Sequence, residues 1–213
     1  MEKEQYDKLM EAASKNAYMS IAVNEDGIPV RGSFIPWERT TSAFNMRTPV
    51  VTLSVSDLQD EQIMAALRSC DLAGCYLFTA LSDYSFLSDF TGLWDLFILH
   101  GENIRDLSFL RSMSELFMFY LEDATLPDLR PLVDCCNASK SFAGKCLGFY
   151  RCRVEDTSAL SDVNCILSEL LVWPVSGDTR ERWKTARKPG VFKFYERIEQ
   201  DCPRARSGIN ICS

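Results

Sequence analysis

The sequence predicts an α/β fold in which short parallel strands follow one another in a single curved sheet, and three observations support it. Apolar side chains recur every 20 residues between positions 70 and 129. A segment rich in β-branched residues, Val50–Val55, precedes these repeats and is typical of a strand. Apolar residues at helical spacing predict an amphipathic helix over residues 2–15. The chain is therefore expected to be a solenoid with an N-terminal cap.

The 20-residue repeat is the strongest of these signals. Twenty residues cannot hold a strand and a long crossover helix, which together take roughly 30 residues. The strands must therefore lie side by side with compact return segments, and the apolar residue at every third position over 105–114 favours a 3₁₀ return. The strands are expected at residues 76–79, 96–99, 116–119, 147–149, 169–173 and 191–195.

The N-terminal region, residues 1–49, is expected to cap the open end of the solenoid with a helix and a hairpin. Asn24–Gly27 is typical of the hairpin turn, because Asp-Gly tolerates positive φ. Asp57 is the predicted N-cap of a second helix over residues 58–69. The expected division is a cap over 1–49, a solenoid over 50–195 and a tail over 196–213.

Composition narrows the class of protein. The net charge of −7 disfavours a nucleic-acid partner, and no uncharged apolar stretch is long enough to predict a membrane span. The first residues, which are charged, do not resemble a secretory leader. The nine cysteines show no repeated spacing, so reduced, buried thiols in a cytoplasmic protein are expected.

The repeat pattern resembles the leucine-rich repeat family over about residues 50–195. Phe97-x-Leu99-x-x-Glu102-x-Ile104 and Leu147-x-Phe149-x-x-Cys152-x-Val154 carry the resemblance. It implies a curved parallel sheet whose concave face binds other proteins. It also implies that the side chain at the position of Cys152 hydrogen-bonds to the turn of a neighbouring repeat. Glu102 and Glu122 stand at the same position but cannot donate when ionised, so the ladder of such bonds is expected to be irregular or filled with water.

Strand alternation predicts which residues form the recognition surface. If Leu77 and Phe97 point into the core, an apolar row points to the concave face, with acidic residues nearby. The predicted binding residues are Phe78, Ile98, Met118 and Val172 in the row, and Glu102 and Glu122 beside it. The expected function is a non-catalytic interaction module for another protein, with no cofactor. Coverage of the row by the chain's own terminal segments is an alternative.

Two other functions remain open. The first is a small enzyme with an acidic or Cys/His pocket at a strand edge, where Asp83, Glu102, Glu122 and Asp123 recur at 20-residue steps near the only histidine, His100. No nucleophile motif accompanies His100, so no catalytic residue is predicted. Zinc is not expected either, because Cys135, Cys136, Cys146 and Cys152 lack paired-knuckle spacing. The second is a homodimer closed by the apolar face.

Overall fold

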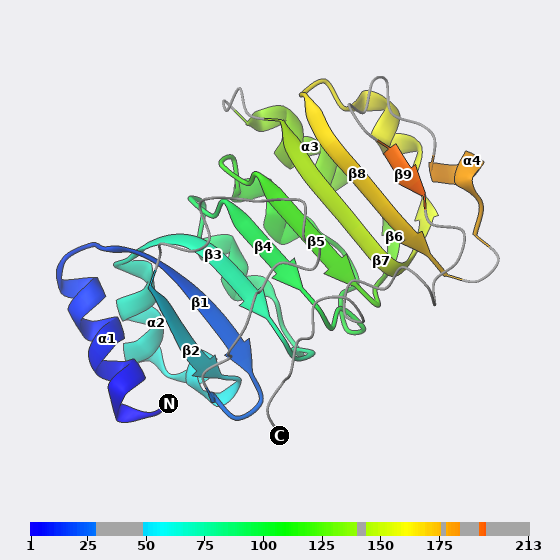
Figure 1. The fold of residues 1–213 in the computed structure, drawn as a ribbon. Helices are drawn as coiled ribbons and strands as arrows, with labels where there is room; N and C mark the ends of the chain where they lie inside the picture. Colours follow the sequence, from blue (N-terminus) through cyan, green and yellow to red (C-terminus); the bar gives the residue numbers. More distant parts are fainter. Residues whose placement is uncertain (29–48, 140–143, 176–177, 184–191, 195–213) are drawn as a thin grey trace. The chain divides into compact units, whose positions relative to one another are not determined.

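The computed structural model describes residues 1–28, 49–139, 144–175, 178–183 and 192–194. It shows an α/β protein in which every described pair of strands is parallel (Figure 1). The described residues form two compact units, one within Met1–Thr79 and one within Ala80–Ile198. In these ranges, each helix is too short or too polar to cross a membrane.

The first unit is a three-stranded parallel sheet with helices. Strand β1 (Tyr18–Asn24) lies between β2 (Val50–Ser54) and β3 (Asp71–Leu77). Helix α1 (Lys3–Ser14) packs against α2 (Glu61–Arg68) and β2. The predicted N-terminal helix and the strand at Val50 are thus present. Strand β1 comes from the segment expected to be a cap, yet it is the central strand of this sheet.

Helix α2 begins at a different residue from the one predicted. Asp60 is its N-cap, and its Oδ1 accepts hydrogen bonds from the backbone of Gln62 at 2.8 Å and Ile63 at 3.2 Å. The predicted cap, Asp57, lies instead in the 3₁₀ helix η1 (Ser56–Gln59) and accepts bonds from Ser54.

The Asn24–Gly27 segment turns as predicted. Gly27 has φ of +68°, and its N–H donates to the Asn24 side chain at 2.6 Å. The second arm of the expected hairpin continues to residue 35, and beyond Ile28 it lies outside the described residues.

The second unit is a larger parallel sheet in the order β4 (Asp95–Ile98), β5 (Met118–Glu122), β7 (Lys145–Asp156), β8 (Leu167–Pro174) and β9 (Phe192–Phe194). The short strand β6 (Thr125–Asp128) also pairs with β7. These strands overlap the predicted ones, except that β6 was not predicted. The four-residue helix α4 (Arg180–Trp183) follows β8.

Compact helical segments precede or connect the strands of the second unit. They are the 3₁₀ helices η2 (Ser85–Asp89), η3 (Ser108–Ser112) and η4 (Ser158–Asp162), and the α-helix α3 (Arg130–Ala138). Helix α3 packs against η3 and η4, while η2 packs against η3, so the four segments form one layer. The 3₁₀ return predicted within 105–114 is confirmed by η3.

The strand register differs from the predicted 20-residue spacing. Asp95 pairs with Met118, Met118 with Cys146, and Cys146 with Glu169, so successive steps are 23, 28 and 23 residues. Relative to the predicted pairing of Ile98 with Met118, the observed register is shifted by three residues. Because an odd shift reverses the face of a strand, Met118 lies on the face opposite Ile98. The prediction that Ile98 and Met118 lie in one row on the same face is therefore wrong.

Both faces of this sheet are packed with large side chains. One face carries Phe97, Tyr120, Tyr150 and Trp173. The ring centres of Phe97 and Tyr120 are 5.9 Å apart, and those of Tyr150 and Trp173 are 6.1 Å apart. The opposite face carries Ile98, Leu121, Phe149 and Val172. All eight side chains are at most 3% exposed, so neither face of these strands is an open surface at these positions.

Candidate functional site

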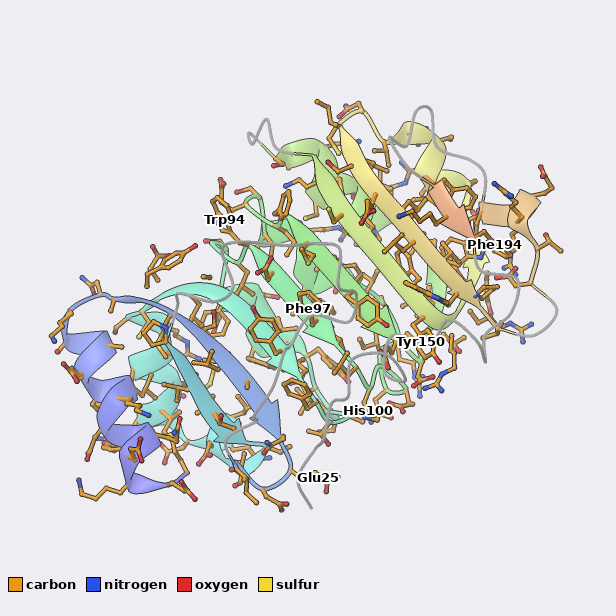
Figure 2. The ribbon with its side chains drawn as sticks, in the orientation of Figure 1. Glu25, Trp94, Phe97, His100, Tyr150 and Phe194 are labelled. Atoms are coloured by element: carbon orange, nitrogen blue, oxygen red, sulfur yellow. The ribbon has the colours of Figure 1, made fainter. Side chains whose placement is uncertain are left out.

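Four polar side chains gather where the strands of the second unit end, and we call them the carboxyl-edge cluster: His100, Glu102, Asp123 and Arg151. His100 and Glu102 follow β4, Asp123 follows β5, and Arg151 belongs to β7. Figure 2 shows His100 beyond the end of β4 and Tyr150, the neighbour of Arg151, toward the same end of β7. Loops at the carboxyl ends of parallel strands are a common place for binding residues.

The loop carrying His100 and Glu102 is held against the end of β5. The Gly101 N–H donates to the Glu122 carbonyl at 2.9 Å, and the Tyr84 hydroxyl donates to the His100 carbonyl at 2.9 Å. A Cβ at position 101 would lie only 2.7 Å from the Glu122 carbonyl oxygen. Glycine is therefore required for this approach, which places His100 and Glu102 beside Asp123.

One ligand atom from each of His100, Glu102 and Asp123 lies within 4.8 Å of the other two. The imidazole Nδ1 of His100 lies 3.3 Å from Glu102 Oε1, and these side chains are 34% and 49% exposed. Such an exposed pair adds little to stability because water screens it. The two side chains are accessible, so they are available to a ligand.

Asp123 and Arg151 form the best-defined interaction of the cluster. Both carboxylate oxygens of Asp123 accept from the Arg151 guanidinium, with Nε donating to Oδ1 at 2.6 Å. This carboxylate raises the pKa of Arg151 above its usual value. The guanidinium also lies 4.7 Å from the centre of the Tyr150 ring, which favours the cation further.

The backbone at both ends of this ion pair is in the left-handed region. Asp123 has φ of +57° and Arg151 has φ of +51°. Such conformations cost about 1–3 kcal/mol each in non-glycine residues, and they are found disproportionately at functional sites. At Arg151, the strand pairing with β8 also shifts register. The bulge directs Arg151 toward Asp123 instead of along the regular alternation of β7.

The two glutamates expected to act alike have different environments. Glu102 is exposed, whereas Glu122 is fully buried and accepts a hydrogen bond from the Tyr120 hydroxyl at 2.8 Å. Of the carboxylates expected along one edge, Glu102 and Asp123 come together. Asp83 instead accepts bonds from the backbone and hydroxyl of Ser85, both at 2.8 Å.

The predicted apolar row does not form an exposed surface. Ile98, Met118 and Val172 are completely buried, and Phe78 is 9% exposed. The binding role of these residues is a prediction that the fold leaves without support.

Two side chains of the second unit hydrogen-bond to the backbone of a neighbouring segment. The Cys152 thiol donates to the Leu121 carbonyl at 3.3 Å. Asn103 donates to the Leu81 carbonyl at 3.0 Å, one residue after Glu102. An amide can donate where an ionised carboxylate cannot.

The four cysteines considered for zinc do not surround a common point. Cys146 and Cys152 are six residues apart in β7, which corresponds to about 20 Å along a strand. Burial raises the pKa of the Cys146 thiol to about 11 and that of Cys152 to about 12. These two thiols are therefore protonated at neutral pH.

Arg151 is the residue of the cluster that sequence reasoning missed. It lies in a run that is otherwise typical of a strand, and nothing in the residue pattern marks the bulge that turns it toward Asp123. Comparison of the chain with protein-family models, curated proteins and solved structures finds no match. The fold and the carboxyl-edge cluster are therefore the features that bear on the class of protein.

Proposed function

We propose that the chain is a non-catalytic protein-interaction module, built as a solenoid of units that resemble leucine-rich repeats. The support is the succession of parallel strand and short helical return from β4 to β8, together with the bridging contacts of Asn103 and Cys152. In this proposal the partner is another protein, and the two interact in the cytoplasm.

The observation that carries the proposal is the location of the accessible polar groups. Side chains of the carboxyl-edge cluster follow β4 and β5 and stand at the bulge of β7, whereas the apolar row is buried. Interaction surfaces on repeat proteins are built from positions that recur from unit to unit. The recognition surface is therefore the edge of the sheet, not its apolar row.

The charge around this edge suggests what the partner presents. Residues 83–129 contain nine acidic residues and only two basic ones, Arg105 and Arg111. A partner segment with Lys or Arg side chains would be attracted to this region, and the attraction would speed association at low salt. His100 and Arg151 add directional hydrogen-bond donors.

A capture experiment with matched charge variants tests this proposal. Wild-type protein, Glu102→Lys and Asp123→Lys are each immobilised and exposed to an extract of the native cell, and bound proteins are quantified by mass spectrometry. Asp134→Lys is the control, because it alters an exposed carboxylate on α3, outside the cluster.

The expected result is at least one protein whose capture falls about tenfold or more with both edge variants and persists with the control, as for a binding hot spot. Calorimetry with that protein, purified, would then show a matching rise in Kd. Equal capture by all four proteins, or capture that depends on Asp134, would contradict the proposal.

A second candidate function is cation binding, and the proximity of His100, Glu102 and Asp123 favours it. Imidazole and carboxylate are ligands that zinc accepts. The Arg151 guanidinium beside Asp123 opposes a cation by its charge. Calorimetric titration with zinc chloride decides between the two: saturable binding that His100→Ala abolishes supports a metal site, and no binding up to millimolar zinc rejects it.

A further inference from the structure

Two cysteines meet at the opposite end of the sheet, and this feature is independent of the proposed interaction function. Cys136 lies near the end of α3, and Cys165 lies in the segment between η4 and β8. The two thiols lie close enough for each to influence the ionisation of the other, with Cys136 as the hydrogen-bond donor. Cys136 is buried, whereas Cys165 is partly exposed.

The residue next to Cys136 fixes this pairing. The Asn137 side chain donates to the Asp162 carbonyl at 2.9 Å and accepts from the Asn164 N–H at 2.9 Å. The end of α3 is thereby held against the chain immediately before Cys165. The two hydrogen bonds of the Asn137 side-chain amide therefore hold Cys136 close to Cys165.

The two thiols differ in their tendency to ionise. The hydrogen bond from Cys136 and the positive charge of Lys145 lower the pKa of Cys165, whereas that hydrogen bond and burial raise the pKa of Cys136. Lys145 is held close because its N–H donates to the Ile166 carbonyl at 2.8 Å and its ammonium donates to the Leu116 carbonyl. At neutral pH the accessible sulfur is thus the better nucleophile.

We propose that Cys165 is a peroxide-reactive thiol and that Cys136 resolves it to an internal disulfide. The Cys165 thiolate attacks a peroxide oxygen, the O–O bond breaks, and an S–O bond forms as hydroxide leaves and is protonated to water. Cys136 sulfur then attacks the Cys165 sulfur, the S–O bond breaks, and the departing hydroxide takes the Cys136 proton as water. For hydrogen peroxide, two thiols are oxidised and one peroxide is reduced to two waters.

Two other described cysteines lack these features. Cys70 is also partly exposed, but its thiol donates to the Ala66 carbonyl at 3.3 Å and burial raises its pKa. Cys135 adjoins Cys136 in sequence, but its thiol donates to the Met113 carbonyl at 3.2 Å. Cys202 and Cys212 lie outside the described residues. Cys70 and Cys135 therefore serve as internal controls.

Peptide mapping of the full-length chain tests the disulfide. The reduced protein is treated with a small excess of hydrogen peroxide, digested without reductant and analysed by mass spectrometry. We expect a linked pair of peptides containing Cys136 and Cys165 that dithiothreitol separates. Cys136→Ser should leave a sulfenic acid at Cys165 that dimedone captures, and Cys135→Ser should keep the linkage. A wild-type protein in which other cysteines pair first, or loss of the linkage in Cys135→Ser, would overturn the proposal.

Alkylation rates of the untreated wild-type protein give a second test that needs no variant. With iodoacetamide at neutral pH, we expect Cys165 to react about tenfold faster than Cys70, because the thiolate is the reacting species. Equal rates, or a faster Cys70, would refute the assignment of Cys165 as the nucleophile.

Discussion

Gly101 shows how one residue without a side chain positions the candidate site. Its N–H bonds to the Glu122 carbonyl, and the space where a Cβ would stand is already taken by that carbonyl and by the Leu121 side chain. The loop after β4 therefore lies directly on the end of β5. His100 and Glu102 reach Asp123 through this contact and not through any bond between their own backbones.

Replacing Gly101 should disturb both stability and the site. We expect Gly101→Ala to lower the free energy of unfolding by about 1–3 kcal/mol, because the new methyl group must displace backbone. Urea denaturation measures this loss, and the His100 NMR signals should shift. His100→Ala is the control, since it keeps the backbone and should change stability by no more than about 0.5 kcal/mol. A stable Gly101→Ala protein with unchanged His100 signals would contradict this account.

Asp57 is a second residue whose surroundings make a testable difference. Burial alone would raise its pKa, but bonds from the Ser54 N–H and hydroxyl, each 2.7 Å, hold the pKa below its usual value. A carboxyl with a depressed pKa in the folded state contributes stability above its unfolded pKa of about 3.9, and that contribution disappears as the pH falls through the folded pKa.

Asp57→Asn should therefore destabilise the protein by about 1–3 kcal/mol at pH 7. The difference from wild type should begin to shrink as the pH falls below about 4, where the unfolded-state carboxyl is protonated, and should disappear as the pH passes through the lowered pKa of the folded state. Denaturant titrations across this range measure the effect. Asp71→Asn, at an exposed position at the start of β3, should have little effect at any pH. A constant difference between Asp57→Asn and wild type down to pH 2 would argue against this explanation.

Strand register decides what the apolar residues of β4, β5 and β8 do. Ile98 and Val172 share one face, Met118 lies on the other, and all three are completely buried. They belong to the core of the second unit on two different faces. A homodimer closed by these side chains has no support, because the residues are not accessible.

Core residues and surface residues respond differently to truncation. We expect Ile98→Ala and Met118→Ala each to lower the free energy of unfolding by about 2–5 kcal/mol. Ile166→Ala is the control, because that side chain is 65% exposed and should cost no more than about 0.5 kcal/mol. Light scattering should show an unchanged molar mass for all three variants. A change of mass with intact stability would restore the apolar row as an association surface.

At the scale of the molecule, the sheet of the second unit has interior strands and an edge strand. β5 and β7 have strand neighbours on both sides and pack on both faces, whereas β9 is three residues long and half-buried. Such differences set how readily backbone hydrogen bonds open.

Hydrogen exchange should follow this arrangement. We expect the amides of Phe119–Leu121 in β5 and Leu147–Phe149 in β7 to exchange at least about a hundredfold more slowly than those of β9. Exchange followed by NMR measures these rates, and the first unit provides a comparison between its central strand β1 and α1. Uniform exchange along the second sheet would mean that these strands are not its interior.

Composition, periodicity and turn residues were sufficient to predict a good part of this protein. They predicted the α/β class, the parallel strands, the 3₁₀ return at η3 and an N-terminal helix over residues 2–15, which is found at Lys3–Ser14. These features depend on local pattern and on the chain length between strands. The same patterns also suggested one edge for Asp83, Glu102, Glu122 and Asp123, of which only Glu102 and Asp123 come together. The register could not be predicted in this way, since the steps between strands vary and a shift of three residues exchanges the two faces.

Tertiary structure alone decided which polar groups meet. Asp123 and Arg151, and likewise Cys136 and Cys165, are more than 20 positions apart in the sequence and meet only in the folded chain. The burial of Glu122 and the bulge at Arg151 depend on a backbone conformation that several strands impose together. A linear pattern specifies which faces are apolar. The positions of side chains across the sheet depend on packing between segments, which is a property of the folded chain.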